Sequence, residues 1–207
     1  MKNRISLLGI IAIVAIIGFG FTACGGDDNT GGGSACNAEC LAIGAVGEGG
    51  GIIIYHKHSG FTVTGAGSFT AYYLEAAQTD QATSVTWSSG EISNFLDVTG
   101  ATGTAIGTGK ANTAAIIAAH SGDTASNNAA KAAVGCTDGG KNDWFLPSRD
   151  ELNEMYKARK HLGISSGHFW SSSQRSDSVA WSKNFASDGQ FYGIKSFDRL
   201  VRAVRAF

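Results

Sequence analysis

The chain has little proline and little charge, and each shortage excludes a class of protein. One proline stands against 29 glycines in 207 residues, which excludes proline-rich linkers and collagen-like repeats. Charged residues make up 16%, with 16 Lys+Arg, 17 Asp+Glu and a formal net charge of -1, so no basic excess favours nucleic acid as a partner. Because 43% of the residues are hydrophobic and 10% aromatic, we expect one folded domain with a sizeable core.

The N-terminus has the layout of an export signal. Two basic residues precede an apolar run from Ile5 to Phe21, and small residues then lead to Cys24. This order is typical of a secretory signal, and a cysteine after two small residues resembles a bacterial lipobox. We therefore expect a signal peptide over residues 1–23 and a lipidated Cys24 that begins a flexible tether over residues 24–41. An uncleaved membrane anchor is the alternative, although the run is slightly shorter than the ~20 residues of a spanning helix.

The protein is thus predicted to be lipid-anchored to a bacterial cell envelope, at the outer membrane and exposed on the surface. If Cys24 is acylated, Cys36, Cys40 and Cys136 remain, which leaves one thiol unpaired whichever bridge forms. A Cys36–Cys40 or a Cys36–Cys136 disulfide would suit an oxidising compartment. The Cys-x3-Cys spacing has no matching second pair and is a weak zinc signal, so neither a metal nor another cofactor is expected.

Short elements separated by glycines make up the rest of the chain. The best-defined helix begins after Ser148, which forms a capping box with Glu151 directly after Pro147. It is expected to reach about His161, with Gly163 just past its end. Core aromatics are predicted at Trp144, Trp170 and Trp181. Apolar runs predict further helices over residues 112–120 and 126–134, and strands over residues 51–55, 72–74, 169–170, 179–181, near 185 and within 200–207.

Two short motifs invite a chemical interpretation. The stretch 107–110 is similar to part of a phosphate-binding loop, but Thr104 stands at the first glycine and Ala111 at the Ser/Thr position. A turn that leads into a helix is the better interpretation. His56 and His58 would lie on one face of an extended segment and could form half of a metal site. The sequence offers no third ligand, so a surface turn is favoured.

Five ordered motifs together resemble one bacterial family. They are the stretches 106–114, 143–152 and 169–173, the Ala180-Trp181 pair followed by Phe185 and Gly189, and the closing stretch 201–205. The resemblance is to C-type-lectin-like variable proteins, including treponeme variable lipoproteins, whose C-terminal segment is rewritten by diversity-generating retroelements. It covers residues 42–207. It implies a single α+β domain there, with the C-type lectin-like fold of the formylglycine-generating-enzyme subtype.

The resemblance also implies a variable region over about residues 168–200 that binds ligands through its loops. Residues that match the constant scaffold are Ser171, Ser172, Trp181, Phe185, Gly189, Lys195, Val201, Arg202, Val204 and Arg205. Residues that fall where relatives vary are Arg175, Ser176, Asp177, Ser178, Ser182, Asn184, Ser187, Asp188, Phe191, Tyr192, Gly193, Ile194, Ser196, Phe197, Asp198 and Arg199. Adenine-directed mutagenesis of Asn codons yields largely this set of amino acids. Lys195 does not fit that set and is therefore counted with the scaffold.

The residue types support the same function without the family. Tyr, Ser, Asn and Asp with occasional Phe and Arg are the composition of adaptable binding loops, and Phe191, Tyr192 and Phe197 are candidate anchors. The expected partner is an unknown protein or glycan at the cell surface, bound by a monomer that also contacts the membrane through its lipid. Ordinary solvated loops, in a structural envelope lipoprotein of the same fold without a dedicated ligand, are the alternative.

Catalysis is not expected. Formylglycine generation needs paired cysteines in the C-terminal half, and no cysteine follows Cys136. Calcium-dependent sugar binding in C-type lectins uses a proline-containing carboxylate and amide motif, whereas the single proline here is Pro147, in another context. An enzyme of unknown chemistry remains the third hypothesis, because the spacing reveals no pair of nucleophile and base.

Overall fold

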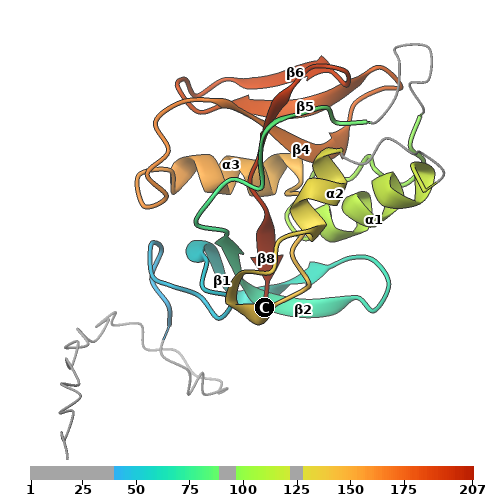
Figure 1. Ribbon diagram of the computed structural model, residues 1–207. Helices are drawn as coiled ribbons and strands as arrows, with labels where there is room; N and C mark the ends of the chain where they lie inside the picture. The colour runs from blue at the N-terminus through green and yellow to red at the C-terminus, as the bar shows by residue number, and fades with distance from the viewer. Residues whose placement is uncertain (1–39, 89–96, 122–127) are drawn as a thin grey trace, which may run out of the picture. The chain divides into compact units, whose positions relative to one another are not determined.

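Two β-sheets with helices between them make up the residues that the computed structural model describes, which are 40–88, 97–121 and 128–207 (Figure 1). These residues belong to one compact unit, Ala38–Phe207, of mixed α+β class. This confirms the predicted fold class, and the arrangement is compatible with a C-type lectin-like fold. The predicted signal peptide, Cys24 and nearly all of the tether lie outside the described residues. Within the three described ranges, no helix combines the length and the hydrophobicity that crossing a bilayer requires.

The smaller sheet has the strand order β1-β2-β8, with both pairs antiparallel. Its strands are β1 (Ile52–Val63), β2 (Phe69–Ala76) and β8 (Val204–Ala206). The strands predicted at 51–55 and 72–74 are confirmed, but β1 is much longer than its apolar run. His56 pairs with Tyr73 of β2, so the surface turn predicted at His56 and His58 is wrong. Pairing with β2 keeps these polar residues extended.

The larger sheet has the order β3-β7-β4-β5-β6. Its strands are β3 (Ala82–Val85), β7 (Arg199–Val201), β4 (His168–Gln174), β5 (Val179–Asn184) and β6 (Gln190–Ile194). All neighbours are antiparallel except β4 and β7, which run parallel. The predicted C-terminal strands are therefore present, and β6 is added to them at one edge of the sheet.

The chain passes from one sheet to the other between β7 and β8. Arg202 lies at this crossing, where its Nε is 2.5 Å from Asp80 Oδ1 and its Nη1 donates to the carbonyls of Ala77 and Gln78. After the crossing, Val204 pairs with Phe145 through reciprocal backbone hydrogen bonds of 2.9 Å. The last residues thus tie the two sheets together, and Figure 1 shows β8 descending toward the smaller sheet.

The α-helices between the sheets are α1 (Gly109–Ala119), α2 (Ala129–Val134) and α3 (Arg149–Lys157), and a 3-10 turn covers Asp138–Gly140. The predicted capping box is present: Ser148 Oγ accepts from Glu151 N at 3.3 Å, and Glu151 Oε2 accepts from Ser148 N at 2.6 Å. The helix ends at Lys157, however, and not near His161. Successive turns follow it instead, closed by short-range bonds such as His161 N to Ala158 O at 2.9 Å.

Most of the predicted core aromatics are buried. Trp144 is 1% and Trp170 0% exposed. Trp87, which the sequence did not single out, is also fully buried, and its indole N–H donates to Ser171 O at 2.7 Å. The prediction that Trp181 belongs to the core is wrong, since this side chain is partly exposed on β5. Its neighbours explain why, as described next.

Candidate functional site

The residues predicted to vary lie on β5, on β6, in the loops around them and at the start of β7, at the top of Figure 1. Nine of the sixteen are exposed and five are partly exposed, whereas two are buried. The exposed group comprises Arg175, Asp177, Ser187, Asp188, Phe191, Tyr192, Ile194, Phe197 and Asp198. The partly exposed group comprises Ser176, Ser178, Asn184, Ser196 and Arg199. We refer to these fourteen residues as the variable face.

The residues matched to the constant scaffold have the opposite placement. Eight of the ten are buried, and Trp181 and Gly189 are partly exposed. The buried group comprises Ser171, Ser172, Phe185, Lys195, Val201, Arg202, Val204 and Arg205. Burial therefore separates the two sets almost completely, although neighbours in the sequence belong to different sets.

Ser182 and Gly193 are the two members of the predicted variable set that solvent does not reach. Ser182 is 2% exposed and pairs with Trp170 on one side and Phe191 on the other. A Cβ atom on Gly193 would lie 2.2 Å from Nη2 of Arg199. Both residues are therefore buried in the sheet, and a side chain at position 193 would displace Arg199.

Four large apolar side chains are exposed within one short stretch of the variable face. Phe191, Tyr192, Ile194 and Phe197 have exposed fractions of 42%, 54%, 39% and 52%. Among the described residues, the other large hydrophobic side chains this exposed are Ile43, Val46, Tyr72 and Val134, which lie elsewhere in the sequence. Because neighbouring residues of a strand point to opposite faces of the sheet, Tyr192 and Ile194 lie on one face of β6 and Phe191 on the other. β6 is the edge strand, so these side chains expose apolar surface along the edge of the sheet, and exposed apolar surface of this kind commonly marks an interaction site.

Two aromatic rings and two guanidinium groups pack against one another around Tyr192. Tyr192 meets Trp181 edge-on, with ring centroids 6.1 Å apart. The guanidinium of Arg175 lies 3.9 Å from the Tyr192 ring and 5.5 Å from the Trp181 ring, and that of Arg149 lies 5.4 Å from Trp181. Trp181 thus packs between two guanidinium groups. Because Trp170 pairs with Ser182, Trp181 points to the opposite face of the sheet from the buried Trp170.

Two residues of this region were not identified from the sequence. Arg149 is the first residue of α3, within the stretch 143–152 that resembles the family, and no pattern indicated a role in binding. His168, at the start of β4, has its Nδ1 2.8 Å from Nη1 of Arg199. Burial and the charge of Arg199 lower the pKa of His168. Both residues reach this surface by tertiary packing, so no local pattern could have indicated them.

Two buried lysines, Lys195 and Lys183, hold the loops that carry residues of the variable face. Lys195 Nζ donates to Gln174 Oε1 at 2.6 Å and lies 4.5 Å from the Trp87 ring. Burial lowers its pKa to about 8, partly opposed by the charges of Asp97 and Asp177. Because Lys195 lies within the variable stretch yet points inward, it anchors the loop between β6 and β7.

Lys183 connects β5 to α3 and to the loop after β5. Its Nζ donates to Asn153 Oδ1 and to the backbone carbonyl of Asp188, both at 3.0 Å, and to Asp188 Oδ1 at 3.2 Å. The Asp188 side chain is 85% exposed, so this ion pair contributes little. The carbonyl bond persists whatever residue stands at position 188, which allows the side chain to change.

The glycine-rich stretch before α1 is not a phosphate site. Gly107 N donates to Glu151 Oε1 at 2.8 Å, and a Cβ on Gly109 would lie 2.2 Å from Glu151 Oε2. A carboxyl group therefore occupies the position that a phosphate would need. Burial raises the pKa of Glu151 to about 7, despite the hydrogen bonds from Ser148, Gly107 and Gly109 that oppose the shift. The predicted turn leading into a helix is confirmed.

Two of the four cysteines, Cys40 and Cys136, belong to the described residues. Cys40 is exposed and Cys136 is buried, and the two form no disulfide with each other. Burial, with Asp138 nearby, raises the pKa of the Cys136 thiol. Cys36, on which both predicted disulfides depend, lies outside the described residues.

Comparison with known proteins identifies the family. The family described as Lcl C-terminal domain matches residues 76–205, which is more than half of the chain and includes the whole variable face. No curated protein matches the chain. The matched range contains β4 to β7, the loops between them and the buried scaffold beneath. The chain belongs to the Lcl C-terminal domain family.

Proposed function

We propose that this chain is a surface-displayed lipoprotein that binds a protein or glycan ligand through its variable face, and that a retroelement diversifies this face. The observation that carries the proposal is the separation by burial: fourteen of the sixteen residues predicted to vary are exposed or partly exposed, whereas eight of the ten predicted to be constant are buried. Membership of the Lcl C-terminal domain family supports a variable, surface-type protein. We further propose that the chain acts as a monomer, which light scattering of the purified protein tests.

The chemistry of the face suits recognition of varied partners. Tyr192 and Phe197 offer large apolar area at low entropic cost, and the surrounding Ser and Asp residues offer hydrogen bonds. Arg175 is already held against Tyr192 at 3.9 Å, so part of the ordering cost is met before a ligand arrives. Because the side chains project from strands held by buried residues, they can change without moving the backbone that carries them.

Binding is tested with a combined variant of the face. The variant carries Arg175→Ala, Tyr192→Ala, Phe197→Ala and Asp198→Ala, and the matched control carries Val46→Ala, Tyr72→Ala and Val134→Ala, which are exposed residues outside the variable region. Each protein is applied to a glycan array and to immobilised, purified cell-surface proteins. We expect both variants to stay folded, since exposed substitutions usually change stability by about 0.5 kcal/mol or less. Only the face variant should lose the ligands that the parent binds; equal losses in both variants, or none, would contradict the proposal.

Diversification is tested in the DNA around the gene. A retroelement leaves a template copy of the variable segment that differs from the gene at adenines. We expect such differences to fall in codons of the sixteen residues predicted to vary and to spare codons of buried scaffold residues such as Lys195 and Val201. Differences spread equally over both sets of codons would oppose diversification but leave ligand binding open to the array test.

The lipid anchor is tested at Cys24. We expect Cys24→Ala to abolish incorporation of labelled palmitate and to release or mislocalise the protein, while Cys136→Ala leaves the label in place. Protease treatment of intact cells should remove the parent protein from the outer surface. Unchanged labelling of the Cys24 variant would show that the thiol is not the acylation site.

A further inference from the structure

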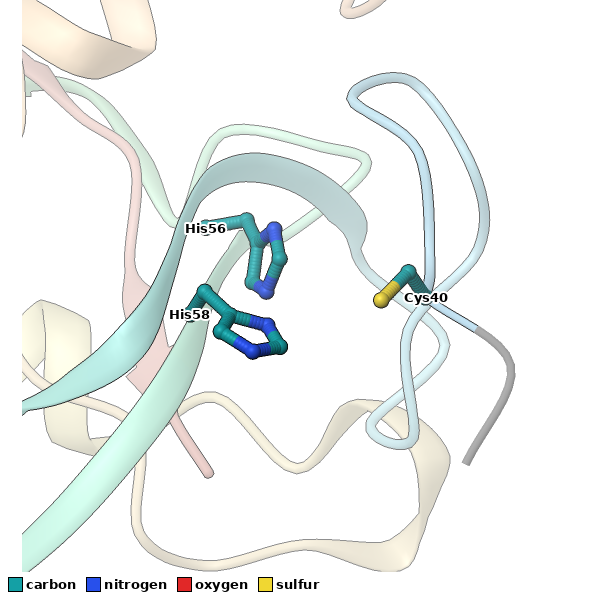
Figure 2. Close-up of side chains that lie close together, drawn as sticks. All are labelled: Cys40, His56 and His58. Carbon is teal, nitrogen blue, oxygen red and sulfur yellow. The ribbon is translucent and has the colours of Figure 1, made fainter. Parts of the chain in front are cut away.

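Three metal-ligating side chains from two separate segments meet beside the smaller sheet. His56 and His58 are two residues apart on β1 and therefore project from the same face. Cys40 approaches them from the segment before β1. One ligand atom of each residue lies within 4.8 Å of the other two. Figure 2 shows both imidazoles extending toward Cys40, whose sulfur points back at them.

Tyr73 holds both halves of this cluster. Its hydroxyl accepts a hydrogen bond of 3.2 Å from Leu41 N, directly after Cys40. Its ring stacks on His56 with centroids 4.6 Å apart and planes 11° apart, and it also stacks on Phe207, at 5.4 Å. One side chain of β2 therefore positions the cysteine segment and the first histidine relative to each other.

Backbone bonds fix the rest of the cysteine segment against β1. Gly44 N donates to Ile53 O at 2.9 Å, and Ile53 N donates to Ala45 O at 2.8 Å. A further bridge joins Val46 to Ile52. The approach of the thiol to the two rings is thus built into the start of the domain and does not depend on one contact.

We propose that Cys40, His56 and His58 bind a zinc ion, with a water molecule as the fourth ligand. A thiolate with two imidazoles is a donor set that Zn²⁺ prefers. Bonds of about 2.0 to 2.1 Å to nitrogen and about 2.3 Å to sulfur put tetrahedral ligand atoms about 3.3 to 3.6 Å apart. The three side chains need to close by about 1 Å, which side-chain rotation supplies because Cys40 and His58 are exposed and His56 is half-buried.

The site is independent of the variable face and has a different role. The variable face belongs to the larger sheet, whereas the three ligands belong to β1 and the segment before it. A bound ion would cross-link the segment that contains Cys40 to β1. It would add to the hydrogen bond from Leu41 N to the Tyr73 hydroxyl, which holds the same segment against β2. Zinc would therefore stabilise the junction between the domain and whatever precedes it.

Calorimetric titration of Zn²⁺ into the full chain tests the proposal, with the protein first treated with a chelator and a phosphine reductant and kept in mild detergent. We expect one zinc equivalent per chain. Cys40→Ser, His56→Ala and His58→Ala should each weaken binding at least about tenfold, because each removes one of three protein ligands. His168→Ala, which removes a histidine exposed on the other sheet, should leave the affinity unchanged. Circular dichroism checks that each variant is folded.

Cobalt identifies the ligand atoms independently. Co²⁺ bound at the same site should give an intense thiolate-to-metal absorption in the near ultraviolet, lost in Cys40→Ser and kept in His168→Ala. The proposal is overturned if the folded parent takes up no stoichiometric zinc, or if Cys40→Ser keeps the parent's affinity. A Cys40 thiol already consumed in a disulfide in the protein isolated without reductant would overturn it as well.

Discussion

The guanidinium of Arg175 lies 3.9 Å from the centre of the Tyr192 ring, and both side chains are exposed. Arg175 stands in the loop after β4 and Tyr192 on β6, so the contact joins two segments of the variable face. Trp181 lies between them on β5 and meets both. The most exposed part of this face is therefore ordered by its own side chains.

A double-mutant cycle measures this contact. Arg175→Ala and Tyr192→Ala should each lower the free energy of unfolding slightly, with a coupling between them of about 0.5 to 1 kcal/mol, as for exposed cation–π pairs. Tyr192→Phe keeps the ring and should keep most of the coupling. Purely additive single effects in urea denaturation would show that the two side chains stabilise the fold independently.

Truncation of Trp170 and of Trp181 should lower the free energy of unfolding by different amounts, although the two residues lie on neighbouring strands of one sheet. Trp170 is fully buried and donates to Val85 O at 3.0 Å, so Trp170→Ala should cost about 3 to 5 kcal/mol. Trp181→Ala removes a partly exposed side chain and should cost clearly less. Equal losses in thermal melts of the two variants would mean that Trp181 is as much a core residue as Trp170.

The different exposure of these two tryptophans could not be predicted from the sequence. Both belong to short apolar runs that predict strands, at 169–170 and 179–181, so the pattern predicts burial for each. What separates them is the register of β4 and β5: Trp170 pairs with Ser182, so Trp181 points to the opposite face, where Arg149 and Arg175 approach it. Such contacts between distant segments leave no local signal.

Local rules succeeded where the physical cause is local. The start of α3 depends on Ser148 and Glu151, three residues apart, and was predicted correctly. Its end is set by a change to tighter local bonds, such as Arg159 N to Tyr156 O at 3.1 Å, and the prediction placed the end four residues too far along the chain. The prediction of a surface turn at His56 and His58 was wrong for a reason that is not local, because β2 pairs with this stretch and its Tyr73 stacks on His56.

The buried ion pair between Arg205 and Glu75 should be among the most sensitive points of the fold. Arg205 Nη1 lies 2.9 Å from Glu75 Oε1, and Glu75 is fully buried. Arg205→Met leaves that carboxylate without its cation and should cost about 3 to 5 kcal/mol. Lys157→Met breaks a surface pair with Glu154 and should cost about 1 kcal/mol or less. Similar denaturation midpoints for the two variants would show that the buried Arg205–Glu75 pair is no more important for stability than the surface Lys157–Glu154 pair.

Glu151 should make the stability of the protein depend on pH. Burial raises its pKa from 4.5 to about 7 in the folded state, so between these values the folded chain holds a proton that the unfolded chain has released. The contribution of Glu151 to stability is therefore most favourable below pH 4.5 and falls as the pH rises toward about 7, where the buried carboxylate is charged. Other groups also titrate in this range, so the effect must be measured against a variant that cannot ionise at position 151.

Glu151→Gln provides that reference, because glutamine also completes a capping box. From pH 4.5 to pH 7, the parent should lose up to about 3 kcal/mol relative to Glu151→Gln, since one unit of pKa shift corresponds to about 1.4 kcal/mol. Ser148→Ala should cost about 1 kcal/mol through loss of the cap and retain the pH dependence, because the carboxyl group remains. Urea denaturation at several pH values measures all three proteins. A constant difference between the parent and Glu151→Gln across this range would mean that Glu151 has the same pKa in the folded and unfolded chain.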